Sequence, residues 1–369
     1  MHCRIGNCLS LSLVVMTLAM ADRAMGQQYI AVVTKSPPLT SLLPGPELAP
    51  TGYYSINYFN FAGGRTGRTF YSPNPLYVAA APRGDGFLVL ADRNGGQGSE
   101  IFRADPLGHA KTIRKFQWRA FNTGFSAPPG IMVGADGVVW IWFESTATKR
   151  TILRIFGPQL RRQLGMYALP SGSRYLGFNS VLSKGREVAL VASARGGGMS
   201  RCSLLVVQEN GRSQLTPLPN VIGSYPQYLA AVGDSVIILT QDGKMIRFHV
   251  LPMGEIKGVR IMDVIRTPPK QFPVTAFAVL NHRTAFYETV TSHTNGSDYR
   301  LFRFSLKTGK VEKSIHLSSE IQRLSVLAGR LLAVTSSGGI TTYTPSLQHV
   351  HSFRPYQPYL EGLAASPTR

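Results

Sequence analysis

Six short, strongly apolar segments recur along this chain at nearly constant spacing, and this repeat restricts the fold more than any other feature. Successive segments begin 51, 48, 48, 49 and 47 residues apart, measured between their turn residues Gly86, Gly137, Gly185, Gly233, His282 and Gly329. Each unit also carries three further strand-like segments. Four strands repeated about every 50 residues are typical of a β-propeller, in which each unit forms one blade.

The unit around Gly137 shows the pattern best. An apolar strand at 131–133 runs into Asp136-Gly137, and an aromatic strand at 138–143 follows at once. Asp-Gly suits a tight turn because glycine tolerates positive φ and aspartate caps its own backbone. The second strand is apolar at almost every position, which predicts burial on both faces between stacked sheets. We therefore expect Trp140 to be almost wholly buried between adjacent blades.

The repeats define a propeller domain over residues 72–358, with six blades favoured and seven possible. Six are favoured because the last unit has its own fourth strand, Gln348 to Phe353. The stretch 27–71 is irregular, and we expect either a strap across one face or a degenerate blade. The tail, 359–369, is predicted to be disordered.

Residues 1–26 have the pattern of a secretory signal. Arg4 gives a positive start, a short apolar core follows, and small residues precede candidate cleavage sites before Asp22 and Gln27. This predicts export to the periplasm or the exterior. No transmembrane segment is expected in the mature chain, because the apolar run is too short to span a bilayer.

Cleavage removes Cys3 and Cys8 and leaves Cys202 as the one cysteine of the mature chain. An internal disulfide is then impossible, so a large core must stabilise the protein. Cys202 begins an apolar strand, and we interpret it as a small buried hydrophobe. We expect a monomer.

The unit Pro129-Gly130-Ile131 … Asp136-Gly137-Val138-Val139-Trp140 resembles blades of secreted propellers related to NHL-repeat proteins, virginiamycin B lyase and the gluconolactonase/regucalcin group. The close match covers that unit, and the other five share its strand-turn-strand spacing. The resemblance implies the propeller fold. It leaves function open, because propellers host both enzymes and binding scaffolds.

The gluconolactonase-like group uses carboxylate and asparagine oxygens around the central channel to hold a divalent cation. In this chain the corresponding channel-mouth positions are all neutral: Asn74, Ser126, Asn179, Gln227, Thr275 and Gln322. Glu320 is the one carboxylate near them, so we predict no metal site and no cofactor. A lyase-like histidine–glutamate pair is approached only by Glu288 and His293, which we interpret as solvated surface of a hairpin.

The net charge is +20, from 39 basic and 19 acidic residues. Such an excess favours contact with polyanions, although it also serves solubility alone. The charges are scattered without a long block, so specific nucleic-acid binding is not expected. The basic-surface candidates are Arg65, Arg68, Lys149, Arg150, Arg161 and Arg162.

Two further patterns carry weaker signals. His349 and His351 are two apart on a strand and are expected to share a face, but a third zinc ligand is not identifiable. Asn295-Gly296-Ser297 fits a glycosylation acceptor if the host is a eukaryote.

Two functions remain open. The first is an exported, non-catalytic propeller that binds a partner, either an unknown protein or an anionic polymer, through its basic loop-bearing surface. The second is an extracytoplasmic hydrolase, lactonase or lyase acting at the channel mouth through Asn179, Gln227 and Arg323. The position of the basic residues in the fold distinguishes the two.

Overall fold

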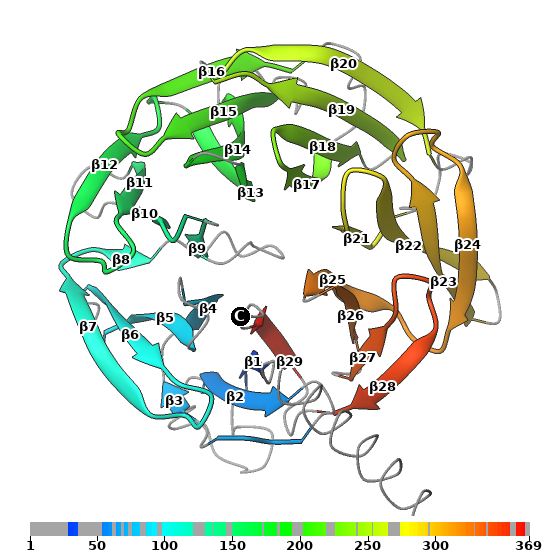
Figure 1. The fold of residues 1–369 in the computed structure, drawn as a ribbon, viewed down its shortest axis with the longest axis horizontal. Helices are drawn as coiled ribbons and strands as arrows, with labels where there is room; N and C mark the ends of the chain where they lie inside the picture. The colour runs from blue at the N-terminus through cyan, green and yellow to red at the C-terminus, as the bar shows by residue number, and fades with distance from the viewer. Residues whose placement is uncertain are drawn as a thin grey trace, which may run out of the picture.

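The computed structural model is a ring of seven β-sheets around a central axis (Figure 1). It describes residues 29–365, except for 36–53, 61–63, 68–69, 73–75, 82–85, 94–97, 121–129, 135, 145–149, 172, 183–184, 194–201, 219–225, 241–242, 253, 265–273, 294–295, 328, 337–338 and 355–358. All the regular secondary structure within these residues is β-strand. The predicted β-propeller fold is confirmed.

Each of the six repeat units forms one blade, with its strands hydrogen-bonded mainly in chain order from the axis outward. The first three units form the following blades. Blade 1 contains β4 (Leu76–Ala80), β5 (Phe87–Asp92), β6 (Ser99–Ala104) and β7 (Ala110–Phe116). Blade 2 contains β8 (Arg119–Ala120), β9 (Ile131–Val133), β10 (Val139–Glu144), β11 (Thr151–Phe156) and β12 (Gln163–Ala168). Blade 3 contains β13 (Ser173–Leu182), β14 (Arg186–Ser193), β15 (Cys202–Gln208) and β16 (Ser213–Pro217).

The other three units follow the same plan around the ring. Blade 4 contains β17 (Pro226–Val232), β18 (Ser235–Thr240), β19 (Lys244–Val250) and β20 (Ile256–Asp263). Blade 5 contains β21 (Ala276–Val279), β22 (Thr284–His293), β23 (Gly296–Ser305) and β24 (Val311–Leu317). Blade 6 contains β25 (Ile321–Leu327), β26 (Arg330–Thr335), β27 (Ile340–Tyr343) and β28 (His349–Phe353).

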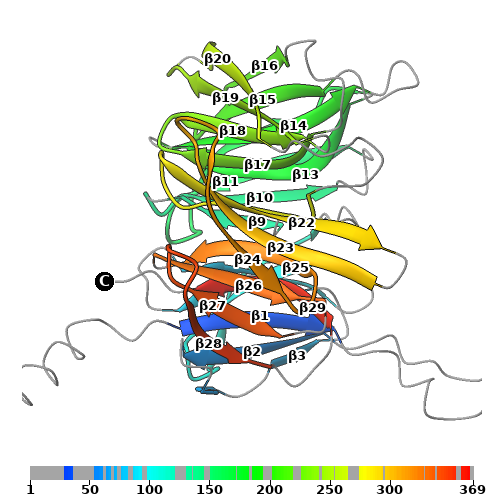
Figure 2. The same cartoon turned by 90° about the vertical axis from the view of Figure 1, so that its right-hand side faces the viewer.

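A seventh sheet, the closing blade, joins the two ends of the chain. Its order is β29 (Tyr359–Ala365), β1 (Tyr29–Lys35), β2 (Tyr54–Asn60) and β3 (Phe70–Ser72). Figure 2 shows β1 and β29 side by side, and they pair antiparallel. The ring therefore has a seventh sheet, the alternative that the sequence left open beside six blades, and β1–β3 fit the degenerate blade that was one of the two expectations for 27–71. Residues 359–365, which were expected to be disordered, form β29. The tail contains glycine and alanine in place of β-branched residues, so its strand propensity is weak, and pairing with β1 supplies what the local sequence lacks.

The core is divided into seven clusters of buried side chains, one at each junction between neighbouring blades. Trp140 is 0% exposed in the cluster between blades 2 and 3, which confirms its predicted burial. Cys202 is buried between blades 3 and 4, also as predicted, and burial raises the pKa of its thiol. Seven sheets with seven cores give a ring in which each blade is held by both neighbours.

Two blades close their outer hairpin in an unusual way. In blades 1, 3, 4 and 5 a glycine takes the positive-φ position of this turn, but blades 2 and 6 place leucine there. Leu160 has φ 60° and Leu347 has φ 59°, and both side chains are buried. A non-glycine residue in the left-handed region is strained, so burial of the leucine side chain must hold it there. The first of these turns lines a groove described below, and the second lies between Tyr343 and His349, which line another.

Candidate functional site

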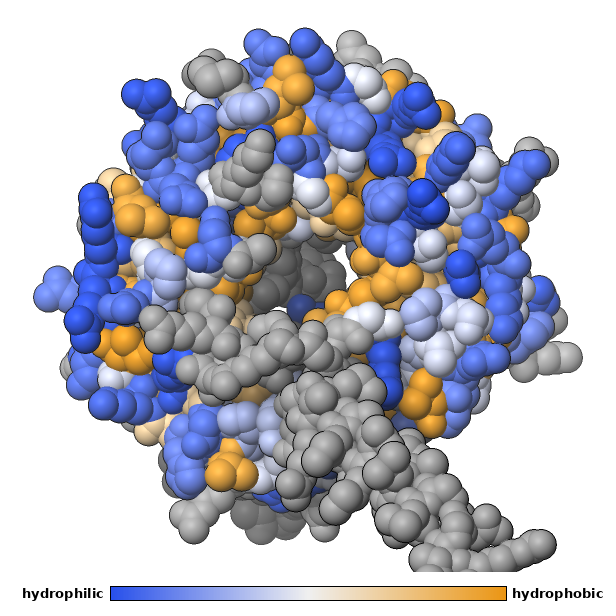
Figure 3. Space-filling view, in the orientation of Figure 1, coloured by the Kyte–Doolittle hydropathy of each residue, from blue (hydrophilic) through white to orange (hydrophobic). Residues whose placement is uncertain are grey.

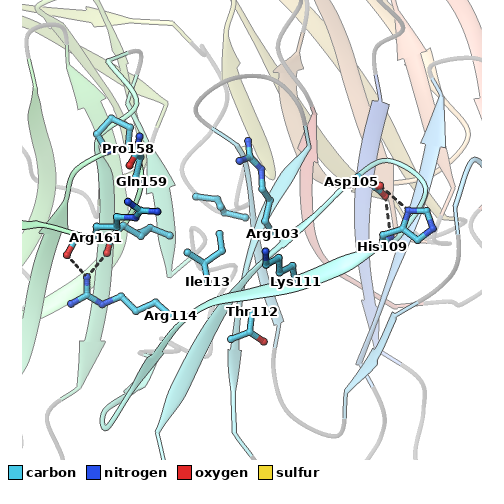
Figure 4. A pocket seen from close by; sticks show the side chains of 12 residues that line it. Arg103, Asp105, His109, Lys111, Thr112, Ile113, Arg114, Pro158, Gln159 and Arg161 are labelled. Atoms are coloured by element: carbon cyan, nitrogen blue, oxygen red, sulfur yellow. Dashed lines mark hydrogen bonds and ion pairs between the residues drawn. The ribbon is translucent and has the colours of Figure 1, made fainter.

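A groove of about 920 Å³ lies between blades 1 and 2 (Figure 4). Residues of β6, β7 and their connecting turn form one side. The turn 158–161, which joins β11 to β12, forms the other. Residues on the two sides are about one repeat apart in sequence, so equivalent positions of neighbouring blades meet here.

Basic side chains dominate this groove. Arg103, Lys111, Arg114 and Arg161 line it, and Asp105 is its one carboxylate among the described lining residues. Asp105 accepts a 2.8 Å hydrogen bond from His109 Nδ1. Burial tends to raise the pKa of Asp105, but hydrogen bonds from His109 and the Leu107 amide outweigh it and lower the pKa. The single acid is thus already engaged within the protein.

Arg114 fixes the far side of the groove. Its guanidinium donates hydrogen bonds to the carbonyl of Leu160 and, at 3.2 Å, to that of Arg161. It also lies 4.7 Å from the Phe156 ring centroid, a cation–π contact. The strained turn that carries Arg161 is therefore tied to blade 1, which holds its backbone in place across the junction.

A fifth basic residue, Arg154, adds positive charge near this junction. Arg154 lies over the rings of Phe143 and Trp118, at 5.4 and 5.9 Å. The pKa of Arg154 is lowered, first by burial and then by the nearby charge of Arg114.

The basic-surface candidates that the structure describes do not form one cluster. Arg161 lines the groove, whereas Arg65 bridges to β2 in the closing blade and Arg150 precedes β11. Arg162 is exposed next to Arg161, and Arg68 and Lys149 lie outside the described residues. Sequence reasoning missed Arg103, Lys111 and Arg114. Their signal was available, because β7 is an outer strand rich in lysine and arginine that lies one period before the 158–161 turn.

The channel-mouth candidates are only partly described. Asn74 and Ser126 lie outside the described residues. Asn179 lies in β13 and Gln227 in β17, and of these two residues the structure describes only the backbone. Gln227 and Gln322 occupy matching irregularities where the registers of β17 and β25 shift, so blades 4 and 6 begin alike. Burial lowers the pKa of Arg323, which sits on the innermost strand of blade 6.

Glu288 corrects one interpretation from the sequence. It was expected on solvated surface, but it is 0% exposed. Its oxygens accept hydrogen bonds from the Ile321 amide of blade 6 at 2.8 and 3.0 Å, and from the Thr275 hydroxyl. The pKa of Glu288 is raised to about 7. Burial raises it most and the nearby Glu320 raises it too, whereas the hydrogen bonds from Thr275 and Ile321 lower it. Glu288 therefore links blades 5 and 6. Thr275, one of the six channel-mouth candidates, donates a hydrogen bond to this linking carboxylate.

The two histidines of β28 also differ from expectation. A register shift places His349 opposite Tyr343 and His351 opposite Thr342, which are adjacent residues on β27. Residues opposite one another share a face, so the bulge turns the two imidazoles to opposite faces. Among the described residues no group of three histidine, cysteine, aspartate or glutamate side chains is placed to hold a metal. Asn295 lies outside the described residues.

Figure 3 shows one face of the ring, with hydrophilic residues at the rim and hydrophobic residues around the central hollow. In the part of the chain that the structure describes, no helix has the length and apolar character needed to cross a membrane.

No protein-family model matches this sequence, and no curated protein matches it. Solved structures do match. The β-propeller domain of the Trilobed protease from Pyrococcus furiosus is 12% identical, with a TM-score of 0.52 over 88% of this chain and 91% of that one. AztD from Citrobacter koseri is 10% identical, with a TM-score of 0.50 over 92% and 97%. These likenesses establish a β-propeller and, at such low identity, the fold alone.

Proposed function

We propose that this protein is a non-catalytic propeller that binds an anionic polymer through the groove between blades 1 and 2. The observation that carries the proposal is the set Arg103, Lys111, Arg114 and Arg161, which faces one groove with Asp105 as its only described acid. Arginine and lysine on a concave surface concentrate positive potential, which attracts and orients polyanions.

The alternative of a channel-mouth hydrolase, lactonase or lyase has weaker support. Glu288, whose pKa of about 7 would suit proton transfer, is fully buried and accepts hydrogen bonds from the Thr275 hydroxyl and the Ile321 amide. A general acid or base must come within hydrogen-bond reach of the substrate. A position inside the inter-blade contact suits a structural role better.

We further propose that the protein is exported and acts as a monomer in the periplasm or outside the cell. The support is the signal pattern of residues 1–26, which lie outside the described structure. Mass spectrometry of the protein recovered from its host should give a chain that begins at Asp22 or Gln27. A mature protein that begins at Met1 would overturn this part of the proposal.

The binding proposal is tested with heparin as a sulfated polysaccharide probe and with inorganic polyphosphate as a second. Affinity is measured by calorimetry from 0.05 to 1 M salt for the wild type and for the double variant Lys111→Gln/Arg161→Gln. The matched control is Lys257→Gln/Arg260→Gln, which removes two exposed charges from β20 in blade 4. Both variants lower the net charge equally, so only position differs.

The groove variant should lose about tenfold or more in affinity at 0.1 M salt, and the control about twofold to threefold. Binding by the wild type should weaken steeply with salt, because the Debye length falls from about 10 Å at 0.1 M to about 3 Å at 1 M. Equal losses in the two variants would assign binding to overall charge and reject the groove. Absence of binding to both probes at 0.05 M salt would reject the function.

A further inference from the structure

A second groove, of about 340 Å³, lies between blades 5 and 6 and differs in chemistry from the first. It is lined by the hydroxyls of three serines and two threonines, by Tyr343, and by the imidazoles of His316 and His349. The described residues that line it include no lysine, arginine, aspartate or glutamate. In a chain with net charge +20, this is a neutral hydrogen-bonding surface.

The polar groups of this groove form a connected row. Ser352 Oγ lies 2.9 Å from His349 Nε2 and 3.0 Å from Thr341 Oγ1. Each hydroxyl both donates and accepts, and its hydrogen rotates to suit a partner. His349 and Ser352 are exposed to solvent, so their remaining hydrogen-bonding capacity faces the groove or water.

Aromatic rings form one side of the groove between blades 5 and 6, and buried residues of blade 6 form its base. The Tyr343 ring meets the His349 ring edge to face, with centroids 6.1 Å apart. Ile321 and Ala333 are buried lining residues, and the amide of Ile321 is held by the Glu288 carboxylate behind it. The link between blades 5 and 6 thus also fixes the base of the groove.

These features define the ligand by its chemistry. Groups that both donate and accept match the hydroxyls of a sugar ring, which do the same, and a flat imidazole or phenol ring packs against its C–H face. A charged ligand would find no opposite charge among the described lining residues. The volume is at the small end of ligand sites, which suits one ring. We propose that this groove binds a single neutral sugar ring, free or at the end of a glycan.

The proposal is tested by saturation-transfer NMR on the full chain with D-glucose, D-galactose, N-acetylglucosamine and maltotriose at 10 mM. The variants are Thr341→Val, which removes one hydroxyl and keeps the shape, and His349→Phe, which removes the imidazole nitrogens. The matched control is His282→Phe, at an exposed turn of blade 5 outside the groove. Ser352→Ala serves as a second hydroxyl variant if Thr341→Val does not fold.

At least one neutral sugar should receive saturation from the wild type, and Thr341→Val should weaken it about tenfold, the worth of one hydrogen bond. His349→Phe should weaken it similarly, and the control should match the wild type. Absence of transfer to all four sugars, or transfer in Thr341→Val and His349→Phe as strong as in the wild type, would overturn the proposal. The double variant Lys111→Gln/Arg161→Gln should leave sugar binding unchanged, so this result is independent of polyanion binding.

Discussion

The junction between blades 1 and 2 and the junction between blades 5 and 6 share a backbone device but differ in chemistry. In both, a buried leucine at positive φ closes the outer hairpin of the following blade. In both, a basic side chain of the preceding blade caps that turn: Arg114 donates to the Leu160 carbonyl, and Lys313 donates to the Ser346 carbonyl at 2.8 Å. The repeat therefore reproduces the turn and its cap.

The grooves beside these turns are not reproduced. One carries four arginine or lysine side chains, and the other carries hydroxyls and imidazoles. The difference arises at positions outside the strand-turn pattern, on β7 in blade 1 and around β27 and β28 in blade 6. A ring of similar blades can thus present different ligand chemistries, because blade packing constrains only the buried faces.

Trp140→Ala should give the largest loss of stability, because its junction between blades 2 and 3 packs the side chain at 0% exposure. Removing a buried tryptophan costs about 3–5 kcal/mol through lost burial and an unfilled cavity. Chemical denaturation monitored by circular dichroism measures this cost. A variant as stable as the wild type would contradict the blade assignment.

Leu160→Ala and Leu347→Ala should cost similar amounts, about 2–5 kcal/mol each, because each removes a buried leucine from an equivalent strained turn. Leu107→Ala is the control, since Leu107 is 55% exposed in the corresponding turn of blade 1. Its cost should stay within about 0.5 kcal/mol. If only one of the two buried leucines matters, the turns are not equivalent and the comparison fails.

Glu288→Gln should change the pH dependence of stability, because Glu288 is a fully buried carboxyl that links blades 5 and 6. The pKa of Glu288 is raised to about 7, from an ordinary value of 4.5. Between these values the folded protein keeps a proton that the unfolded chain releases, so stability falls as pH rises. The loss is on the order of 3 kcal/mol by pH 8.

The groups facing Glu288 are Thr275, the Ile321 amide, Glu320, Tyr228 and Tyr343. The pKa values of both tyrosines are raised, first by burial and then by the charge of Glu288, so they stay neutral through this window. Unfolding free energies from pH 4.5 to 8 should therefore fall less in Glu288→Gln than in the wild type. Glu255→Gln, at an exposed position, should follow the wild type. Parallel curves for Glu288→Gln and the wild type would remove Glu288 as the cause.

Much of the fold follows from the sequence, because the apolar strands and their turns repeat at the period of a blade. The same period identifies neighbours across junctions: Arg114 and Leu160, Trp142 and Glu187, and Arg186 and Asp234 are separated by 46, 45 and 48 residues and are hydrogen-bonded. The closing blade was left only as an alternative, because its strands come from both ends of the chain and lack the repeat.

The grooves were harder to predict. Arg161 was a candidate, but its companions Arg103 and Lys111 belong to another blade and come close only after the ring forms. Glu288 was misplaced because its hairpin looks polar in sequence, whereas β22 and β25 bury its carboxyl between blades. Sequence patterns report the face that a strand buries against its own neighbours. They do not report which polar side chain lies against the next blade.

Exchanging the two capping side chains should have the smallest effect and sharpens the comparison most. Arg114 is half-buried, lies over Phe116 and Phe156 and bonds two carbonyls, whereas Lys313 is exposed and bonds one. Arg114→Lys keeps the charge but loses the planar contact and one hydrogen bond, so it should cost about 1 kcal/mol. Lys313→Arg loses neither and should stay within about 0.5 kcal/mol. Thermal unfolding at constant pH and salt measures both. Equal costs would mean that the caps are interchangeable and that the aromatic rings at blades 1 and 2 add nothing to the hold on the turn carrying Arg161. A cost confined to Arg114→Lys would show that this turn is held more firmly than its counterpart, as a preorganised charged groove requires.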